Sequence, residues 1–173
     1  MAEEDGKYLL LSKYGLDAKP YHSQDVDIAW EKSTIREWLN QDFMNSAFTE
    51  GEQALISETK VDNSETAGYS GYDARGGNNT KDQVFLLSYK EAFEDYFTSD
   101  TARICMPTNY AVQQGAWEIV TTGACWWWLR SPGDVWSNAI YVDPDGSRSL
   151  DYVPDENLCV RPALWIDLKS DIF

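Results

Sequence analysis

The sequence predicts an α+β domain in which helices come first and an irregular, loop-rich antiparallel sheet follows. Helix-capping signals precede amphipathic spacing in the first half of the chain, and strand-like runs surround a tight turn near residue 146. Two apolar blocks that contain tryptophan flank that turn. Because 173 residues is the length of one domain, we expect residues 1–173 to form a single unit.

The first predicted elements are a strand and a helix. Residues 8–12 form an apolar run that is typical of a short buried strand. Thr34 and Glu37 have the spacing of a capping box, in which a hydroxyl and a carboxylate accept hydrogen bonds from free amides at a helix start. The apolar residues that follow recur at helical spacing and predict one buried face: Ile35, Trp38, Leu39 and Phe43.

Two further capping boxes predict two more helices. One box lies at residues 49–52, before the apolar run 54–56. The other lies at residues 88–91, after a strand at 84–87, and opens a helix with Ala92, Phe93, Tyr96 and Phe97. Residues 62–83 are polar and rich in glycine, which predicts a long loop. After about residue 104 the helical periodicity ends, so we expect strands and turns from there on.

The strongest strand signal is a hairpin around Pro144-Asp145-Gly146-Ser147. An Asp-Gly pair between two strand-like runs is typical of a tight hairpin turn, and the runs are residues 138–143 and 149–153. Strand alternation places Ile140 and Val142 on the inner face. It places three residues on the outer face: Ala139, Tyr141 and Asp143.

Two blocks flank this hairpin, residues 126–133 (WWWLRSPG) and residues 160–166 (VRPALWI). We call them the flanking blocks. Each contains one arginine, Arg130 or Arg161, and an arginine between aromatic residues usually fixes loops through directed hydrogen bonds and stacking. We therefore expect the flanking blocks to belong to the core. We expect the polar insert between them, residues 134–159, to be presented to a ligand.

The charge of the chain limits its partners. The formal net charge is −15, which repels phosphate backbones and anionic lipid surfaces, so we expect neither nucleic-acid binding nor membrane insertion. This charge serves solubility or recognition of a basic partner. No apolar run is long enough to span a bilayer, and the acidic start at Met1 lacks the apolar core of a signal peptide. The protein is therefore either cytoplasmic or a domain of a longer cell-surface or phage-borne protein.

Catalytic and metal-binding patterns are weak. His22 is the single histidine and has no motif around it, and Ser131 lies in Arg-Ser-Pro-Gly, which favours a structural turn over a nucleophile. The aspartates near the hairpin turn lack the ligand spacing of a calcium loop. The three cysteines match no zinc spacing, so they are buried free thiols, or one disulfide and one free thiol: Cys105, Cys125 and Cys159.

The flanking blocks resemble an uncharacterised bacterial domain family that is defined by WWLRSPG and a closing GVRPALW. The resemblance extends over residues 8–168, with similar segments at 33–40 (STIREWLN), 84–88 (VFLLS) and 105–111 (CMPTNYA). One position departs from the pattern, because Cys159 stands where the family usually has glycine.

That family is similar to C-type-lectin-like folds, which also include formylglycine-generating enzymes, and some members are the variable proteins of diversity-generating retroelements. In those systems, adenine-directed mutagenesis rewrites codons near the C-terminus, and the fold displays the new side chains to a ligand. Residue types in the insert can be reached from adenine-rich asparagine codons. The resemblance therefore implies a display domain for a macromolecular ligand, namely a protein.

The residues expected to contact that ligand are polar and aromatic, as in antibody paratopes. They are Asp134, Trp136, Ser137, Asn138, Tyr141, Asp143, Arg148, Ser149, Asp151, Tyr152, Glu156 and Asn157. The alternatives are a fixed carbohydrate- or peptide-binding module of the same fold, or an oxidase similar to the formylglycine-generating enzymes. Those enzymes bind copper through two close cysteines, and the sequence has no such pair, so we expect no enzymatic activity, no cofactor and no metal.

Overall fold

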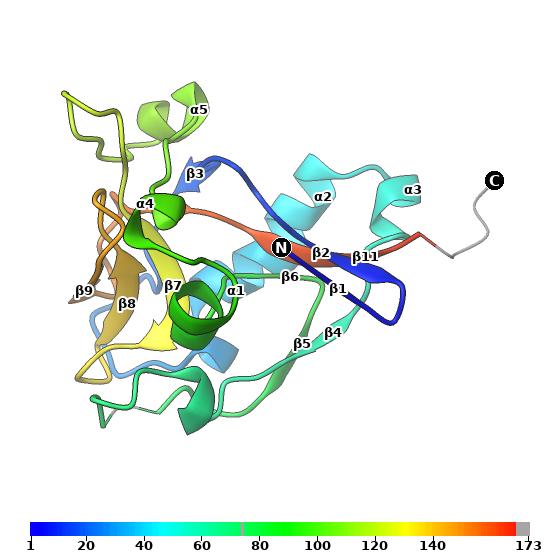
Figure 1. Ribbon diagram of the computed structural model, residues 1–173, viewed down its shortest axis with the longest axis horizontal. Helices are drawn as coiled ribbons and strands as arrows, with labels where there is room; N and C mark the ends of the chain where they lie inside the picture. Colours follow the sequence, from blue (N-terminus) through cyan, green and yellow to red (C-terminus); the bar gives the residue numbers. More distant parts are fainter. Residues whose placement is uncertain (74, 169–173) are drawn as a thin grey trace.

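A computed structural model describes residues 1–73 and 75–168, and in this part of the chain the strands form three sheets (Figure 1). Together with the short helices they make a mixed α+β fold. The four-stranded sheet has the order β1–β2–β11–β6, with bounds Ala2–Glu4, Lys7–Leu11, Ala163–Asp167 and Val84–Phe85. The five-stranded sheet has the order β3–β10–β7–β8–β9, with bounds Asp17–Ala18, Cys159–Val160, Trp127–Pro132, Asn138–Val142 and Arg148–Tyr152. The small sheet pairs β4 (Thr59–Val61) with β5 (Thr80–Asp82).

The strand predicted at residues 8–12 is β2, and it pairs antiparallel with β11 near the other end of the chain. The prediction that this strand is buried is wrong for part of it. Leu9 is buried, whereas Tyr8 and Leu10 are exposed. Successive side chains of a strand point to opposite faces, and only one face of β2 is covered.

The helices of the described residues are short, and they lie in the first two thirds of the chain (Figure 1). Their bounds are η1 Trp30–Lys32, α1 Thr34–Trp38, η2 Leu39–Phe43, α2 Met44–Ala47, α3 Glu50–Gln53, η3 Glu65–Ala67, η4 Glu91–Asp95, α4 Asp100–Arg103 and α5 Asn109–Gln113. Within the described ranges 1–73 and 75–168, none of them has the length and apolar character needed to cross a membrane.

The first predicted capping box is wrong by one residue. Ser33, not Thr34, caps α1, because its hydroxyl accepts a hydrogen bond from the Arg36 amide. The helical spacing itself is confirmed, since Ile35 and Leu39 are fully buried along the continuous run α1–η2–α2. This run packs against β6, where the Asn40 side chain bonds both backbone groups of Val84.

The other two capping boxes are confirmed. Thr49 and Glu52 exchange hydrogen bonds at the start of α3. Ser88 and Glu91 do the same before η4, which is a π-helix rather than the expected α-helix. The long loop predicted at residues 62–83 is partly wrong, because its last residues form β5 and its first turn contains η3.

The expectation that helices end after residue 104 is also wrong, since α5 lies at Asn109–Gln113. The hydroxyl of Thr108 caps this helix by accepting a hydrogen bond from the Ala111 amide. With five residues, α5 is too short to show an amphipathic period, but its capping residue was visible in the sequence.

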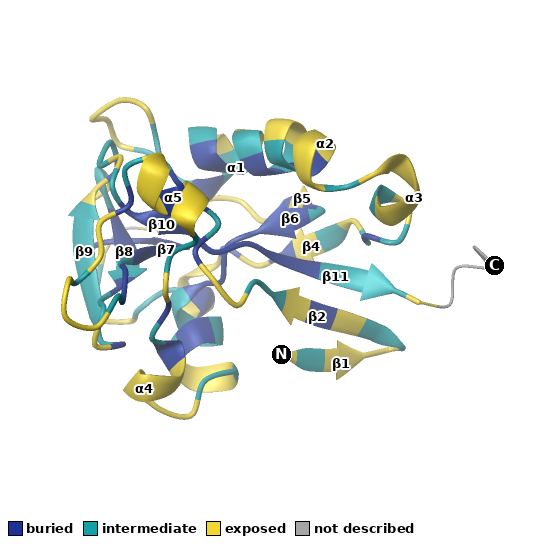
Figure 2. Ribbon diagram, turned by 90° about the horizontal axis from the view of Figure 1, so that it is seen from above, coloured by how far each residue is buried: buried dark blue, intermediate teal, exposed yellow. Residues whose placement is uncertain are grey.

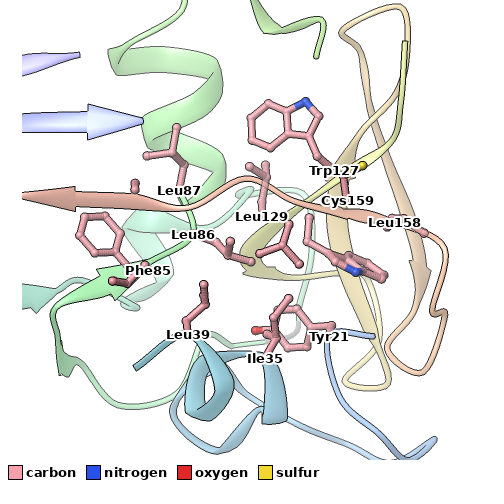
Figure 3. Close-up of a cluster of buried hydrophobic side chains, with 14 of the residues drawn as sticks. Tyr21, Ile35, Leu39, Phe85, Leu86, Leu87, Trp127, Leu129, Leu158 and Cys159 are labelled. Carbon is pink, nitrogen blue, oxygen red and sulfur yellow. The ribbon is translucent and has the colours of Figure 1, made fainter. Parts of the chain in front are cut away.

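The core lies between the helical run and the five-stranded sheet (Figure 3). Trp127 and Trp128 of the first flanking block have no exposed surface, as the sequence predicted for most of the tryptophans. Trp127 donates its indole hydrogen bond to the Arg103 carbonyl and Trp128 donates to the Lys19 carbonyl. Both indoles therefore bury their large apolar area without leaving a polar group unpaired.

The two arginines of the flanking blocks fix loops, as predicted. Arg130 is 2% exposed and pairs with Glu91, while its other donors bond the carbonyls of Leu86 and Asp62 and the side chain of Asn63. Arg161 lies over the Trp127 ring, 4.8 Å from the ring centroid. Its Nε bonds the Ser12 carbonyl. A buried guanidinium needs several acceptors; side chains and backbone carbonyls share this role for Arg130, and backbone carbonyls supply it for Arg161.

Candidate ligand-binding surface

The predicted hairpin forms with the predicted turn. The Asp143 amide bonds the Ser147 carbonyl at 2.7 Å, and the Gly146 amide bonds the Asp143 carbonyl at 2.8 Å. Gly146 has a φ of +88°, a conformation that glycine adopts without a steric penalty. The register then places Ile140 opposite Leu150 and Tyr141 opposite Ser149. This hairpin positions most of the residues predicted to bind a ligand.

The two faces of β8 differ in exposure. Ile140 and Val142 are fully buried, as predicted, and Tyr141 is half-buried. Ala139 was predicted to point outward, but it is also fully buried. Ala139 lies opposite Pro132 of β7 and Asp151 of β9 and belongs to the core cluster, so the outer face of β8 is also covered at that point.

One face of the hairpin combines aromatic side chains with carboxylates, and we call it the acidic face. Its residues are Trp126, Tyr141, Asp143, Ser149, Asp151 and Asp155. Tyr141 lies near its centre and packs edge-on against the buried Trp128, with ring centroids 6.2 Å apart. The buried tryptophan therefore holds the half-buried tyrosine in place.

The carboxylates of the acidic face lie close enough to influence one another. Burial raises the pKa of Asp151, and the neighbouring Asp155 raises it further. Burial also raises the pKa of Asp143, with a smaller contribution from Asp145. Burial raises the pKa of Tyr141, which faces the same group of carboxylates. In the described part of the chain, no lysine or arginine forms an ion pair with these aspartates.

A second group of predicted residues lies at the open end of the hairpin, where β8 begins and β9 ends. Trp136 is 39% exposed and Tyr152 is 59% exposed. Asp134, Ser137 and Asn138 lie beside them. The loop that carries Trp136 is held by its backbone, because the Trp136 carbonyl accepts from Ile28 and the Ser137 carbonyl accepts from Val153. These two aromatic side chains are therefore exposed on a fixed backbone.

Arg148 was predicted to contact a ligand, but its side chain is already engaged within the protein. Its guanidinium lies 3.7 Å from the centroid of the Tyr69 ring, and it donates a hydrogen bond to the Tyr72 hydroxyl at 2.5 Å. These contacts join β9 to the loop before β5. The structure thus gives Arg148 a packing role.

Glu156 and Asn157 do not lie with the rest of the predicted site. The Asn157 side chain bonds the Gly115 carbonyl at 2.9 Å, and its own carbonyl accepts from the Trp117 amide. Glu156 borders a shallow hollow next to Trp38 and Gln114. The two residues therefore lie beside α5, where Asn157 fixes the loop that follows this helix.

Sequence reasoning missed two tryptophans that extend the surface. Trp126 is half-buried, and its side chain faces Asp143, where it favours the charged form and lowers the pKa of that carboxylate against the effect of burial. Its ring packs edge-on against Trp117, with centroids 6.3 Å apart, and Trp117 is 55% exposed. Strand alternation was a usable signal for Trp126, because this residue directly precedes β7 and alternation places it on the same face as Trp128.

The residues weighed as catalytic candidates have structural partners. The His22 imidazole accepts a hydrogen bond from the Thr34 amide, and burial lowers its pKa. The Ser131 hydroxyl accepts from the Tyr89 amide, so this serine stabilises β7 and does not form the predicted turn. Neither side chain is placed next to a cysteine thiol by any contact in the described residues.

The three cysteines are buried free thiols, which was the first of the two expectations from sequence. They gather although they lie far apart in the chain, because Cys105 pairs with Cys125 across an isolated bridge and Gly15 packs against Cys159 and Cys125. A hydrogen bond to Cys125, together with burial, raises the pKa of Cys105. Thiols in this state are poor nucleophiles. Among the described residues, no group of three or more histidine, cysteine or carboxylate side chains is arranged to hold a metal ion.

Comparison with known proteins places the chain in a family. No curated protein and no solved structure matches it. Residues 5–168, nearly the whole chain, match the family described as Domain of unknown function (DUF6273), and the protein belongs to that family.

Proposed function

We propose that this domain binds a macromolecular ligand, a protein, through the acidic face and the exposed pair Trp136 and Tyr152. In this proposal the fold is C-type-lectin-like and the domain is the variable protein of a diversity-generating retroelement. It acts by display and catalyses no reaction. The insert at residues 134–159 provides the contacts, and the flanking blocks keep its backbone in one conformation.

One observation carries the proposal, namely the separation of core and surface residues within the hairpin. Ile140, Val142 and Val153 have no exposed surface and belong to the core. Tyr141, Ser149, Asp151 and Tyr152 alternate with core residues or lie on the edge strand, and each is at least partly exposed. Side chains in such positions can change while Ile140, Val142 and Val153 keep their places in the core, which is what a diversified surface requires.

A rigid backbone also favours binding. The turn is closed by two backbone hydrogen bonds, and Arg103 donates to the Gly146 carbonyl at 2.8 Å, which ties the hairpin tip to α4. A surface that is ordered before it meets its ligand loses less conformational entropy on binding. Tyrosine and tryptophan add contact area at low entropic cost, as in antibody paratopes.

The retroelement part of the proposal has a direct genetic test. The DNA that flanks the gene should encode a reverse transcriptase and contain a near-copy of the codons for residues 126–165, differing mainly at adenines. A neighbourhood without both features would contradict the retroelement assignment and leave a fixed binding module of the same fold.

The binding part is tested by selection from a library of random peptides displayed on phage. The purified domain is the bait, and the matched control is the variant with Trp136→Ala, Tyr141→Ala and Tyr152→Ala. We expect enriched peptides that bind the natural domain and not the variant, while circular dichroism shows both to be folded. Enriched peptides that bind both proteins equally would show that the proposed surface is wrong.

A further inference from the structure

The strand β9 forms an open edge of the five-stranded sheet. It pairs with β8 on one side, and in the described part of the chain no strand pairs with its other side. Figure 2 shows β9 at one end of the molecule, next to β8 and outside the helical layer. An open edge carries backbone donors and acceptors that another extended chain can bind.

The hydrogen bonds at the two ends of the hairpin show which backbone groups face this edge. Asp143 bonds Ser147 at the turn, and Val153 bonds Ser137 at the open end. Bonded pairs alternate along an antiparallel ladder, so Ser149 and Asp151 bond to β8. The N–H and C=O groups of the residues between them point away from β8.

The open window consists of Arg148 and Leu150. It ends at Tyr152, whose amide bonds the Asp151 side chain and whose carbonyl accepts from Asp155. At its other end the turn begins. The window therefore offers two donors and two acceptors to an extended chain that adds to this edge.

The charge next to this edge selects the occupant. Ser149 and Asp151 of β9 belong to the acidic face, where Asp143 and Asp155 add carboxylates that no cation of the described residues neutralises. A second copy of the chain would bring two such acidic faces together, and its net charge of −15 adds to the repulsion. A basic segment would instead neutralise the carboxylates and could place a cation over the Tyr141 ring.

We infer that the protein ligand adds an extended, basic segment to β9, with lysine or arginine at alternate positions. In a strand, alternate side chains share one face, so only this spacing places each cation on the acidic face. The inference rests on the proposed function and names the chemistry of its partner. In this inference the backbone of the ligand binds the open edge of β9, and its basic side chains bind the acidic face.

The inference is tested with two synthetic peptides of identical composition. In one, lysines alternate with threonine and valine, and in the other the lysines form one block. We expect the alternating peptide to bind about tenfold more tightly in calorimetry, because only it can place its cations on one face while forming the backbone bonds. Equal binding of both peptides would overturn strand addition and leave non-specific charge attraction.

Two sets of variants separate the contribution of the backbone edge to binding from the contribution of the carboxylates. Leu150→Pro removes an amide that faces the open edge and leaves the ladder to β8 intact, so binding should fall by about tenfold with an unchanged circular dichroism spectrum. Asp151→Asn with Asp155→Asn should weaken binding and reduce its dependence on salt. Unchanged affinity in the folded Leu150→Pro variant would overturn the inference.

Two further experiments cover a variant that does not fold and a second copy of the chain as the ligand. If Leu150→Pro does not fold, alternating peptides N-methylated on either alternate set of amides replace it, and one set should abolish binding while the other has little effect. Gel filtration of the natural domain alone should show a monomer, and a dimer lost in Leu150→Pro would identify a second copy as the occupant. Selected phage peptides that require Trp136, Tyr141 and Tyr152 but bind Leu150→Pro normally would support the proposed function and contradict this inference.

Discussion

The strands β7 and β9 belong to one sheet and are separated only by β8, yet their side chains have opposite environments. All six residues of β7 are buried. In β9, four residues are partly exposed and Tyr152 is exposed. The difference follows from position, because β7 has strand neighbours on both sides and is covered on both faces, whereas β9 has one neighbour.

This contrast teaches how the domain can combine stability with a surface that tolerates change. The contacts that hold the sheet together are made by β7 and its partners, namely the indoles of Trp127 and Trp128 and the guanidinium of Arg130. In β9, Leu150 packs against the core from a partly exposed position, and Arg148 stacks on Tyr69. The following predictions test this division, beginning with the largest expected effect.

The largest effect is expected for the arginine of β7. Arg130→Ala leaves Glu91 without its cation and removes the donors to Leu86 and Asp62, so we expect a loss of about 3–5 kcal/mol in the free energy of unfolding. Arg148→Ala, its matched control in β9, loses the cation–π contacts with Tyr69 and Tyr72 and one hydrogen bond, about 1–2 kcal/mol. Urea unfolding of both variants measures the two free energies of unfolding. Equal losses of stability would contradict the proposed difference between β7 and β9.

A medium effect on stability is expected at the hairpin turn, because Gly146 packs tightly against Asp100 of α4. A Cβ at Gly146 would lie 1.8 Å from the Asp100 carbonyl oxygen, and its φ of +88° disfavours any other residue. Gly146→Ala should therefore cost about 2 kcal/mol. The control is Gly51→Ala in α3, where nothing lies within 4 Å, and it should stabilise the protein by about 0.5–1 kcal/mol. If the Gly146→Ala variant kept the melting temperature of the natural protein, the hairpin turn would not be packed tightly against α4.

The smallest effect is expected for charge on the acidic face. The folded-state pKa of Asp151 is raised, so its carboxylate form is disfavoured by folding, and this cost is present at neutral pH and disappears as the pH falls below the ordinary carboxyl pKa. Asp151→Asn should therefore stabilise the protein at pH 7 by about 0.5 kcal/mol and have no effect near pH 3.

Asp145 provides a control of opposite sign for this pH experiment. A hydrogen bond from the Ser147 side chain, with a second from its amide, lowers the pKa of Asp145. Its carboxylate is favoured by folding, so it contributes stability at neutral pH that is lost as the pH falls through its folded-state pKa. Asp145→Asn should destabilise at pH 7. Thermal melts of both variants across pH 3–7 make the measurement. If the melting temperatures of both variants shifted in the same direction, the opposite pKa shifts assigned to Asp151 and Asp145 would be wrong.

The sequence predicted the features that depend on neighbours in the chain. The hairpin follows from Asp145 and Gly146, because a tight turn is a local property. The capping box at Thr49 and Glu52 is equally local. The capping position before α1 was missed by one residue because Ser33 and Thr34 are both good caps, and only the backbone conformation decides between them.

The sequence could not predict features that depend on distant contacts. Arg148 is predicted as a ligand contact because nothing near it in the chain reveals Tyr72, which lies 76 residues away. Ala139 is predicted to point outward because the covering of β8 comes from other segments. Glu156 and Asn157 follow the hairpin in sequence, but the chain turns toward α5 before it reaches them.

The most direct test of this account compares two libraries of the domain, each displayed on yeast and sorted for protease resistance. In the first library, Tyr141, Ser149, Asp151 and Tyr152 are randomised together, and in the second, Trp127, Leu129, Arg130 and Ile140 are randomised. We expect most members of the first library to stay folded, since Ser149, Asp151 and Tyr152 lie on the edge strand and Tyr141 is only half-buried, and almost none of the second. Similar folded fractions in the two libraries would contradict the separation of scaffold and displayed surface.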